Sequence, residues 1–160
     1  HIDAPFHFDQ HGKKVHQLDL STFIGTCSVI HLPNIDTITI ASLNSLPLDN
    51  TERLLIRTDC WENRSTFPLQ YTSIDPDVPY FLKQKGVKLL GIDIPSVDPY
   101  NSETLPIHHA LHKNSIHILE RIVLDVIKPG IYELIALPLA ITGGDASPVR
   151  AILRQNIPLL

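Results

Sequence analysis

The sequence contains no methionine and only two cysteines in 160 residues, and aromatic residues make up just 6% of it. Cys27 and Cys60 are too few for a disulfide scaffold, and they lack the paired spacing of a zinc ribbon. No block of Lys or Arg occurs, and the formal net charge is −4. The apolar runs are short and interrupted by proline, so none is long enough to span a bilayer. We therefore expect a cytoplasmic protein that has neither a nucleic-acid partner nor a membrane partner.

An apolar fraction of 43% and a charged fraction of 19% are typical of a folded domain. The chain shows no internal repeat and no low-complexity linker, so we expect a single domain over residues 1–160. Short strand patterns alternate with short helical patterns, which predicts an α/β fold with a mixed sheet. The predicted strands are 27–32, 54–58, 89–94, 117–119, 132–137 and 149–153, and the predicted helices are 40–45, 79–84 and 102–112.

Histidine is abundant: the chain has nine. Eight of them fall into two groups far apart in the sequence, and the fold is expected to bring these groups together. The front group is His1, His7, His11 and His16, and the late group is His108, His109, His112 and His117.

The segment from His1 to Phe8 reads HIDAPFHF. In extended backbone, residues two apart point the same way, so His1, Asp3 and His7 can share one side. Pro5 is expected to hold this segment extended. Two imidazoles and a carboxylate form half of a site for Zn²⁺ or Mn²⁺. The alternative is a hydrogen-bonded His–Asp pair on the surface.

In the late group, His108 lies in a helical pattern, and Glu120 follows the apolar residues Ile116, Ile118 and Leu119. A charge at the end of such a run is costly unless it is exposed or paired with a metal. Glu120 is therefore either a metal ligand or an exposed strand terminus. The other late histidines, His109, His112 and His117, cannot all be ligands.

These residues resemble the signature H-x-G-T-H-x-D-x-P-x-H of the cyclase-type metal-dependent hydrolases, whose best-known members are bacterial kynurenine formamidases. HIDAPFHF is similar to the second part of that signature. Further segments that are similar to the family follow in the expected order along nearly the whole chain: LLIRTDCW from Leu54, GVKLLGIDIPSVDP from Gly86, LPIHHAL from Leu105, ILE ending at Glu120, PGIYELIALPL from Pro129 and DASPVRAIL from Asp145.

The resemblance implies an α/β fold of the swivelling type and a homo-oligomer, either a dimer or a larger assembly. It also implies metal coordination, with a pair of zinc ions expected and Mn²⁺ as the alternative metal. Its implied ligands are His1, Asp3, His7, His108 and Glu120. His11 matches the histidine that acts as the catalytic acid or base.

The implied reaction is hydrolysis of a small-molecule aryl amide, N-formyl-kynurenine, to kynurenine and formate. Trp61, the single tryptophan, is expected either to stack on the aryl group of the substrate or to pack in the core. Ser96 and Asp98 either lie near the site or only turn the chain. A Rossmann-type nucleotide site has little support, because Gly143-Gly144 does not form G-x-G-x-x-G after a strand.

Two other functions stay open. One is a related hydrolase of a cyclic amide, such as an isatin-like ring. The other is a truncated family member without activity, because the chain begins inside the signature and lacks its first His, Gly and Thr. We expect the sequence to be an N-terminally incomplete part of a longer enzyme.

Overall fold

The structure is a computed structural model that describes residues 1–155. Four parallel strands form the centre of its main sheet: β2 (Ile24–His31), β4 (Arg53–Arg57), β6 (Leu89–Ile92) and β7 (His117–Leu119). The residues of β6 are all buried, as a strand covered on both faces requires. The structure confirms the strands predicted in these four regions.

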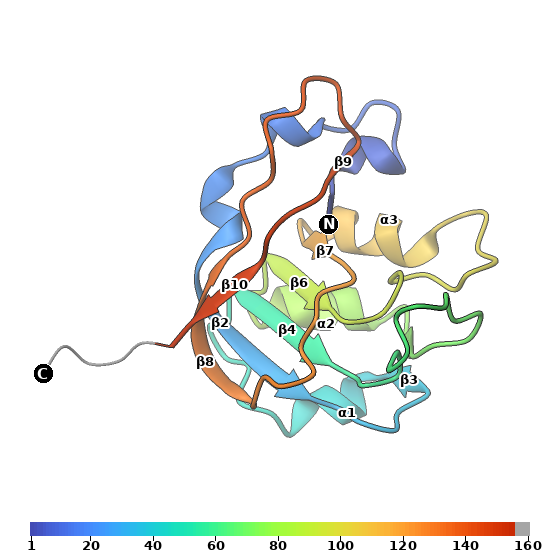
Figure 1. Cartoon of the computed structure of the whole chain (residues 1–160), viewed down its shortest axis with the longest axis vertical. Coiled ribbons are helices and arrows are strands. Elements are labelled where there is room, and N and C mark those ends of the chain that lie inside the picture. Colours follow the sequence, from blue (N-terminus) through green and yellow to red (C-terminus); the bar gives the residue numbers. More distant parts are fainter. Residues whose placement is uncertain (156–160) are drawn as a thin grey trace, which may run out of the picture.

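Antiparallel strands extend this sheet on both sides (Figure 1). On one side β8 (Gly130–Ile135) pairs with β2, and β10 (Ile152–Arg154) pairs with β8. On the other side β1 (Ile2–Asp3) pairs with β7, and β9 (Ala146–Ser147) pairs with β1. The full order is β10-β8-β2-β4-β6-β7-β1-β9, so the mixed sheet that the sequence predicts is confirmed.

Within residues 1–155, three α-helices accompany the sheet: α1 (Ile40–Asn44), α2 (Val78–Gln84) and α3 (Pro106–Lys113). The sequence pattern predicts a helix from residue 102, but α3 begins only at Pro106. Leu105 has a φ of +46° and is not helical, since a following proline disfavours the α conformation of the residue before it. In the described part of the chain, no helix has the length and apolar character that crossing a membrane requires.

The remaining elements are short. Strands β3 (Thr37–Ile38) and β5 (Ser73–Ile74) form a separate parallel pair. Three 3₁₀ turns, Pro5–His7, Val15–Gln17 and Leu20–Phe23, lie between β1 and β2. The sequence patterns did not predict any of these elements, because each is too short to show a period.

The core consists of two apolar layers, one on each face of the sheet. All three helices pack on the same face, where Leu54, Leu90 and Ile92 of the central strands lie. On the other face, Leu55 and Leu89 pack against the segments between β1 and β2. The first layer is closed by Leu43, Leu82, Ile107 and Leu111 of the helices, and the second by Ile2, Val15, Leu18, Phe23, Leu119 and Leu134.

The expectation that Pro5 keeps the first segment extended is wrong. The chain is extended only through β1, and Pro5 then begins the 3₁₀ turn Pro5–His7. Proline is well suited to the first position of a helical turn, because its φ is already helical and no N–H is needed there. Gly12 packs on this turn so closely that a Cβ on it would lie 2.5 Å from the carbonyl carbon of Pro5.

Candidate metal centre

The antiparallel pairing of β1 with β7 brings the two histidine-rich regions together. Ile2 lies opposite Leu119, and Asp3 lies opposite Ile118. One residue further along, the N–H of Glu120 donates to the carbonyl of His1 (3.0 Å), and the backbone nitrogen of His1 donates to the carbonyl of Glu120 (3.2 Å). Because side chains alternate along a strand, His1 and Asp3 project on the same side as Glu120.

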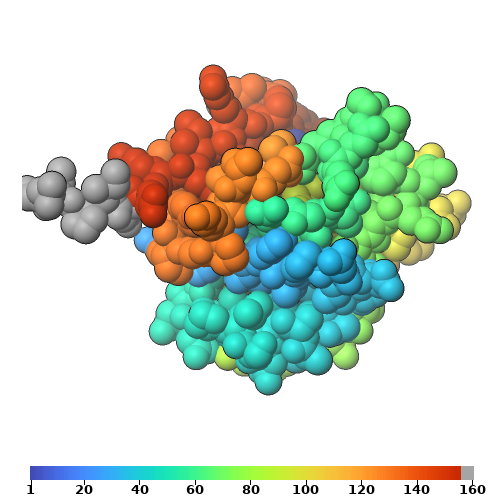
Figure 2. All heavy atoms as spheres, turned by 60° about the horizontal axis from the view of Figure 1, so that its bottom comes forward, coloured from blue at the N-terminus to red at the C-terminus, as the bar shows by residue number. Residues whose placement is uncertain are grey.

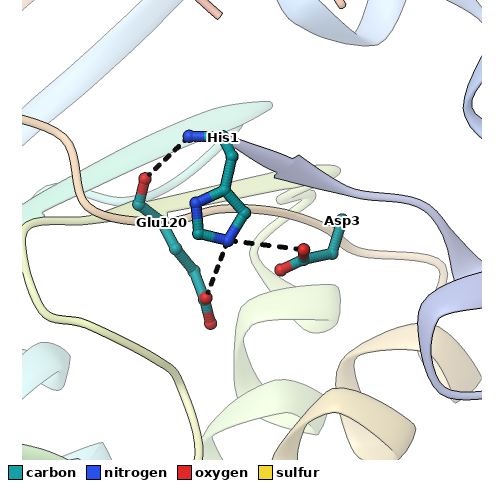
Figure 3. Close-up of side chains that lie close together, drawn as sticks. All are labelled: His1, Asp3 and Glu120. Carbon is teal, nitrogen blue, oxygen red and sulfur yellow. Dashed lines mark hydrogen bonds and ion pairs between the residues drawn. The ribbon is translucent and has the colours of Figure 1, made fainter. Parts of the chain in front are cut away.

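Four side chains converge at this point, three of which appear in Figure 3. The Nε2 atom of His1 lies 3.4 Å from Asp3 Oδ1 and 3.3 Å from Glu120 Oε2. The Nε2 atom of His108, in the first turn of α3, lies 3.8 Å from Asp3 Oδ2 and 3.6 Å from Glu120 Oε1. Asp3 and Glu120 are each only 3% exposed, and His108 is 2% exposed.

The connection between β6 and α3 holds two of these side chains in place. Asp98 accepts hydrogen bonds from the Nδ1 of His108 (2.7 Å) and from the backbone N–H groups of Ile107 (2.9 Å) and His108 (3.0 Å). The backbone N–H of Val97 donates to Glu120 Oε1 (2.7 Å). With its Nδ1 bound to Asp98, His108 presents Nε2 to Asp3 and Glu120.

The charges in the cluster compensate one another. A hydrogen bond to Glu120 is the main cause that raises the pKa of His1. Burial lowers the pKa of His108, but the nearby carboxylate of Asp3 and the hydrogen bond to Asp98 outweigh it and raise this pKa to about 9. Burial likewise favours the neutral acid of Asp98, yet its hydrogen bonds with His108 and Ile107 lower its pKa. The neighbouring carboxylates are therefore the physical cause of the raised pKa of both imidazoles.

The donor set fits a divalent metal ion. One oxygen of Asp3, Oδ2, is buried and has no hydrogen-bond partner among residues 1–155. Ligand atoms of His1, Asp3 and Glu120 all lie within 4.8 Å of one another. Imidazole nitrogens and carboxylate oxygens are the ligands that Zn²⁺ and Mn²⁺ accept, and protons compete with a metal for the same ring nitrogens.

His7 lies beside this cluster, but it is directed elsewhere. Its ring centroid is 6.1 Å from that of His108, whereas its Nδ1 lies 3.0 Å from Asp145 Oδ2. The turn that begins at Pro5 changes the direction of the chain, so the side that His1 and Asp3 share does not continue to His7. A ligand role for His7 stays a prediction.

His11 lies in the exposed loop that follows this turn. Its Nε2 is 3.3 Å from the side-chain nitrogen of Gln10, and its backbone N–H donates to Asp9 (2.9 Å). Both contacts are local, so the catalytic role of His11 also stays a prediction.

Trp61 is half-buried in the loop after β4 and belongs to an aromatic group outside the two core layers. Its ring centroid lies 6.0 Å from that of Phe67, and the guanidinium groups of Arg64 and Arg121 are each 6.0 Å from its centroid. Its indole N–H donates to the carbonyls of Asn63 and Thr66.

The sequence leaves the role of Asp98 open between a position near the site and a turn. In the structure Asp98 does both: its carboxylate accepts hydrogen bonds from the first turn of α3 and from the ring of His108. An acidic residue ahead of a proline-initiated helix that carries a candidate ligand is the signal that could have identified it. The sequence gives no such signal for Arg121, since nothing in the pattern around it distinguishes it from a surface residue.

Comparison with known proteins agrees with the fold. Residues 1–99 match the model of the Cyclase family, described as "Putative cyclase". The chain belongs to this family, whose match covers the front group of histidines and the strands up to β6.

Individual relatives extend the match over nearly the whole chain. A protein of Geobacillus thermodenitrificans named kynurenine formamidase is 55% identical, over 97% of this chain and 74% of that protein. A protein of Bacillus cereus with the same name is 48% identical, over 96% of this chain and 74% of that protein. A solved structure titled "Potential Metal-Dependent Hydrolase With Cyclase Activity" superposes with a TM-score of 0.86 at 27% identity, over 95% of this chain and 75% of that one.

Replacing Glu120 with Gln should weaken Zn²⁺ binding while leaving the fold intact, because Gln keeps an oxygen for the N–H of Val97 but carries no charge. Removing a residue that only hydrogen-bonds a metal ligand costs roughly 10–100-fold in metal affinity. Because Glu120 is itself a proposed ligand, we expect Glu120→Gln to cost more than this. Competition titration with a chromogenic chelator measures it. Glu103→Gln, which changes an exposed carboxylate, is the control. Equal affinity of the two variants would contradict a ligand role for Glu120.

Asp98→Asn should lower Zn²⁺ affinity by about 10–100-fold, because the ring of His108 loses its charged partner. Asp77→Asn is the matched control: Asp77 also precedes a helix, but its side chain makes no capping hydrogen bond. Both variants are titrated with metal and melted thermally. If Asp98→Asn bound Zn²⁺ as tightly as the control variant, Asp98 would not orient His108 for a metal.

Proposed function

We propose that this chain is a metal-dependent amide hydrolase that converts N-formyl-kynurenine to kynurenine and formate. One observation carries the proposal: two buried carboxylates and two imidazoles, from regions more than 100 residues apart in the chain, converge within 3.3–3.8 Å. The name of the relative that is 55% identical over 97% of this chain supports the choice of substrate.

His1, Asp3, His108 and Glu120 would hold the metal, with His7 as a further ligand. We propose zinc, two ions per chain, with Mn²⁺ as the alternative. A bound ion of this kind polarises the carbonyl of the substrate and makes hydroxide available at neutral pH.

The chain's own residues supply orientation and proton transfer. Asp98 keeps Nδ1 of His108 occupied, so that the ring has its Nε2 free for the centre. The N–H of Val97 fixes one oxygen of Glu120. We propose that His11 gives a proton to the departing aryl amine nitrogen, because the amine leaves poorly as an anion. Trp61 is proposed to contact the aryl group of the substrate.

We further propose a homo-oligomer, a dimer or larger. An exposed apolar row crosses the outer strands and supports it: Ile24 of β2 and Ile152 of β10 both lie opposite Ile135 of β8. Ile24 is 39% exposed and Ile152 is 49% exposed.

We also propose a cytoplasmic location. The free cysteines at positions 27 and 60 suit the cytoplasm, where thiols stay reduced.

The test of the function is release of formate and kynurenine from N-formyl-kynurenine by the purified protein. We expect turnover that a strong chelator abolishes and that added Zn²⁺ or Mn²⁺ restores. Turnover that resists chelation would contradict the metal-dependent mechanism. Opening of isatin without any deformylation would instead establish the cyclic-amide alternative.

His11→Asn should retain its metal but lower turnover by about 10²–10⁴-fold, the usual contribution of a general acid or base. Metal content and steady-state kinetics are measured on the same sample. His16→Asn, at another exposed histidine of the front group, serves as the control and should leave turnover unchanged. Wild-type turnover in His11→Asn would remove His11 from the mechanism, and loss of metal would make it a ligand.

A further inference from the structure

Arg121 directly follows Glu120 of the candidate metal centre, and its backbone has a φ of +57°. A positive φ is unusual for a residue with a long side chain, and such conformations persist only where surrounding contacts enforce them. Here the backbone N–H of Arg121 donates to the carbonyl of Ile94 (3.2 Å), and its Nε donates to the carbonyl of Pro95 (3.2 Å). Both ends of the residue are therefore fixed to the segment that also carries Val97 and Asp98.

Two aromatic rings hold the guanidinium group of Arg121. Its central carbon lies 5.3 Å from the ring centroid of Phe67 and 6.0 Å from that of Trp61, distances at which a cation is attracted by an aromatic face. Figure 2 shows the orange segment after β7 lying against the green segment after β4. The side chain is thus positioned more firmly than an exposed arginine usually is.

The charge of Arg121 has no carboxylate partner in the part of the chain that the structure describes. Four other arginines there form ion pairs, Arg53 with Glu52, Arg57 with Asp59, Arg64 with Asp125 and Arg154 with Glu133, whereas Arg150, like Arg121, forms none within residues 1–155. For Arg121, no such pair occurs within residues 1–155, and its one side-chain hydrogen bond there uses Nε. Its two terminal nitrogens remain able to donate together to a carboxylate, the geometry that a guanidinium favours.

Arg121 borders a pocket that one residue of the candidate metal centre, His1, also borders. The pocket has a volume of about 370 Å³ and is bounded by His1, Arg121 and Arg150 together with apolar side chains that include Leu119, Ile122 and Leu134. This size is in the usual range for small-molecule sites. A ligand that has an aryl body and an anionic end would meet an apolar wall and two cationic side chains here, of which Arg121 is held by Trp61 and Phe67.

We propose that Arg121 binds the carboxylate of the substrate and so selects aryl formamides that carry an amino-acid side chain. This inference rests on the proposed function, because it concerns the same site and the same class of substrate.

The test compares two substrates that differ only in the charged part. N-formyl-kynurenine carries the amino-acid side chain, and ortho-formamidoacetophenone has the same formyl amide and ketone without it. In the wild type we expect a lower KM for N-formyl-kynurenine. Arg121→Gln should raise that KM by about 10–100-fold, because losing a charge-assisted pair weakens substrate binding by about that factor. The same variant should change the KM for ortho-formamidoacetophenone by less than about twofold, and Arg121→Lys should restore part of the difference.

Arg64→Gln is the matched control, since Arg64 also lies 6.0 Å from the Trp61 ring but is paired with Asp125. It should leave the preference between the substrates unchanged. A second readout is binding of the two product amines, kynurenine and ortho-aminoacetophenone, followed by fluorescence of Trp61 or by calorimetry. Only the affinity for kynurenine should fall in Arg121→Gln.

Equal effects of Arg121→Gln on both substrates, or no preference in the wild type, would overturn the role of Arg121 while leaving the hydrolase function standing. Absence of turnover with both substrates would contradict the proposed function instead. In that case the binding comparison still decides whether Arg121 recognises a carboxylate, because it needs no catalysis.

Discussion

The candidate centre depends on one short antiparallel pairing, that of β1 with β7. The pairing contains only two residue pairs, Ile2 with Leu119 and Asp3 with Ile118, and the backbone bonds between His1 and Glu120 extend it. A shift by one residue would turn His1 and Asp3 to the opposite face. Ile2 and Leu119 resist such a shift, because both are 0% exposed in the apolar layer beneath. Burial of apolar neighbours thus fixes the register of the polar ligands.

Burying two carboxylates side by side is costly, and the surroundings of Asp3 and Glu120 show how the cost is offset. Glu120 receives the N–H of Val97, and the imidazoles of His1 and His108 carry raised pKa values beside the pair. Asp3 Oδ2 still has no hydrogen-bond partner among residues 1–155. An unpaired buried oxygen of this kind lowers stability, and a divalent cation would satisfy it. Stability and metal binding are therefore linked at this cluster.

Much of the fold could be predicted from sequence, because the central strands are apolar runs bounded by turn residues, and the predicted strand 117–119 has the same bounds as β7. The conformation of the front segment could not be predicted, since Pro5 is compatible with both extended backbone and the first position of a turn. The convergence of His1 and Asp3 with His108 and Glu120 followed from the two histidine groups. The contacts of Asp98 with His108 and of Arg121 with Pro95 could not be predicted, because they depend on how the segment between β6 and α3 folds back onto the end of β7.

Anomalous X-ray diffraction from crystals soaked in Zn²⁺, recorded on both sides of the zinc absorption edge, tests the metal centre most directly. The expected result is a peak bounded by Nε2 of His1, Nε2 of His108 and the carboxylates of Asp3 and Glu120, with a second peak nearby if two ions bind. Coordination of the first ion by the unpaired oxygen of Asp3 would explain why that oxygen is buried. Zinc bound only at other histidines, with these four side chains still paired to one another, would contradict the assignment.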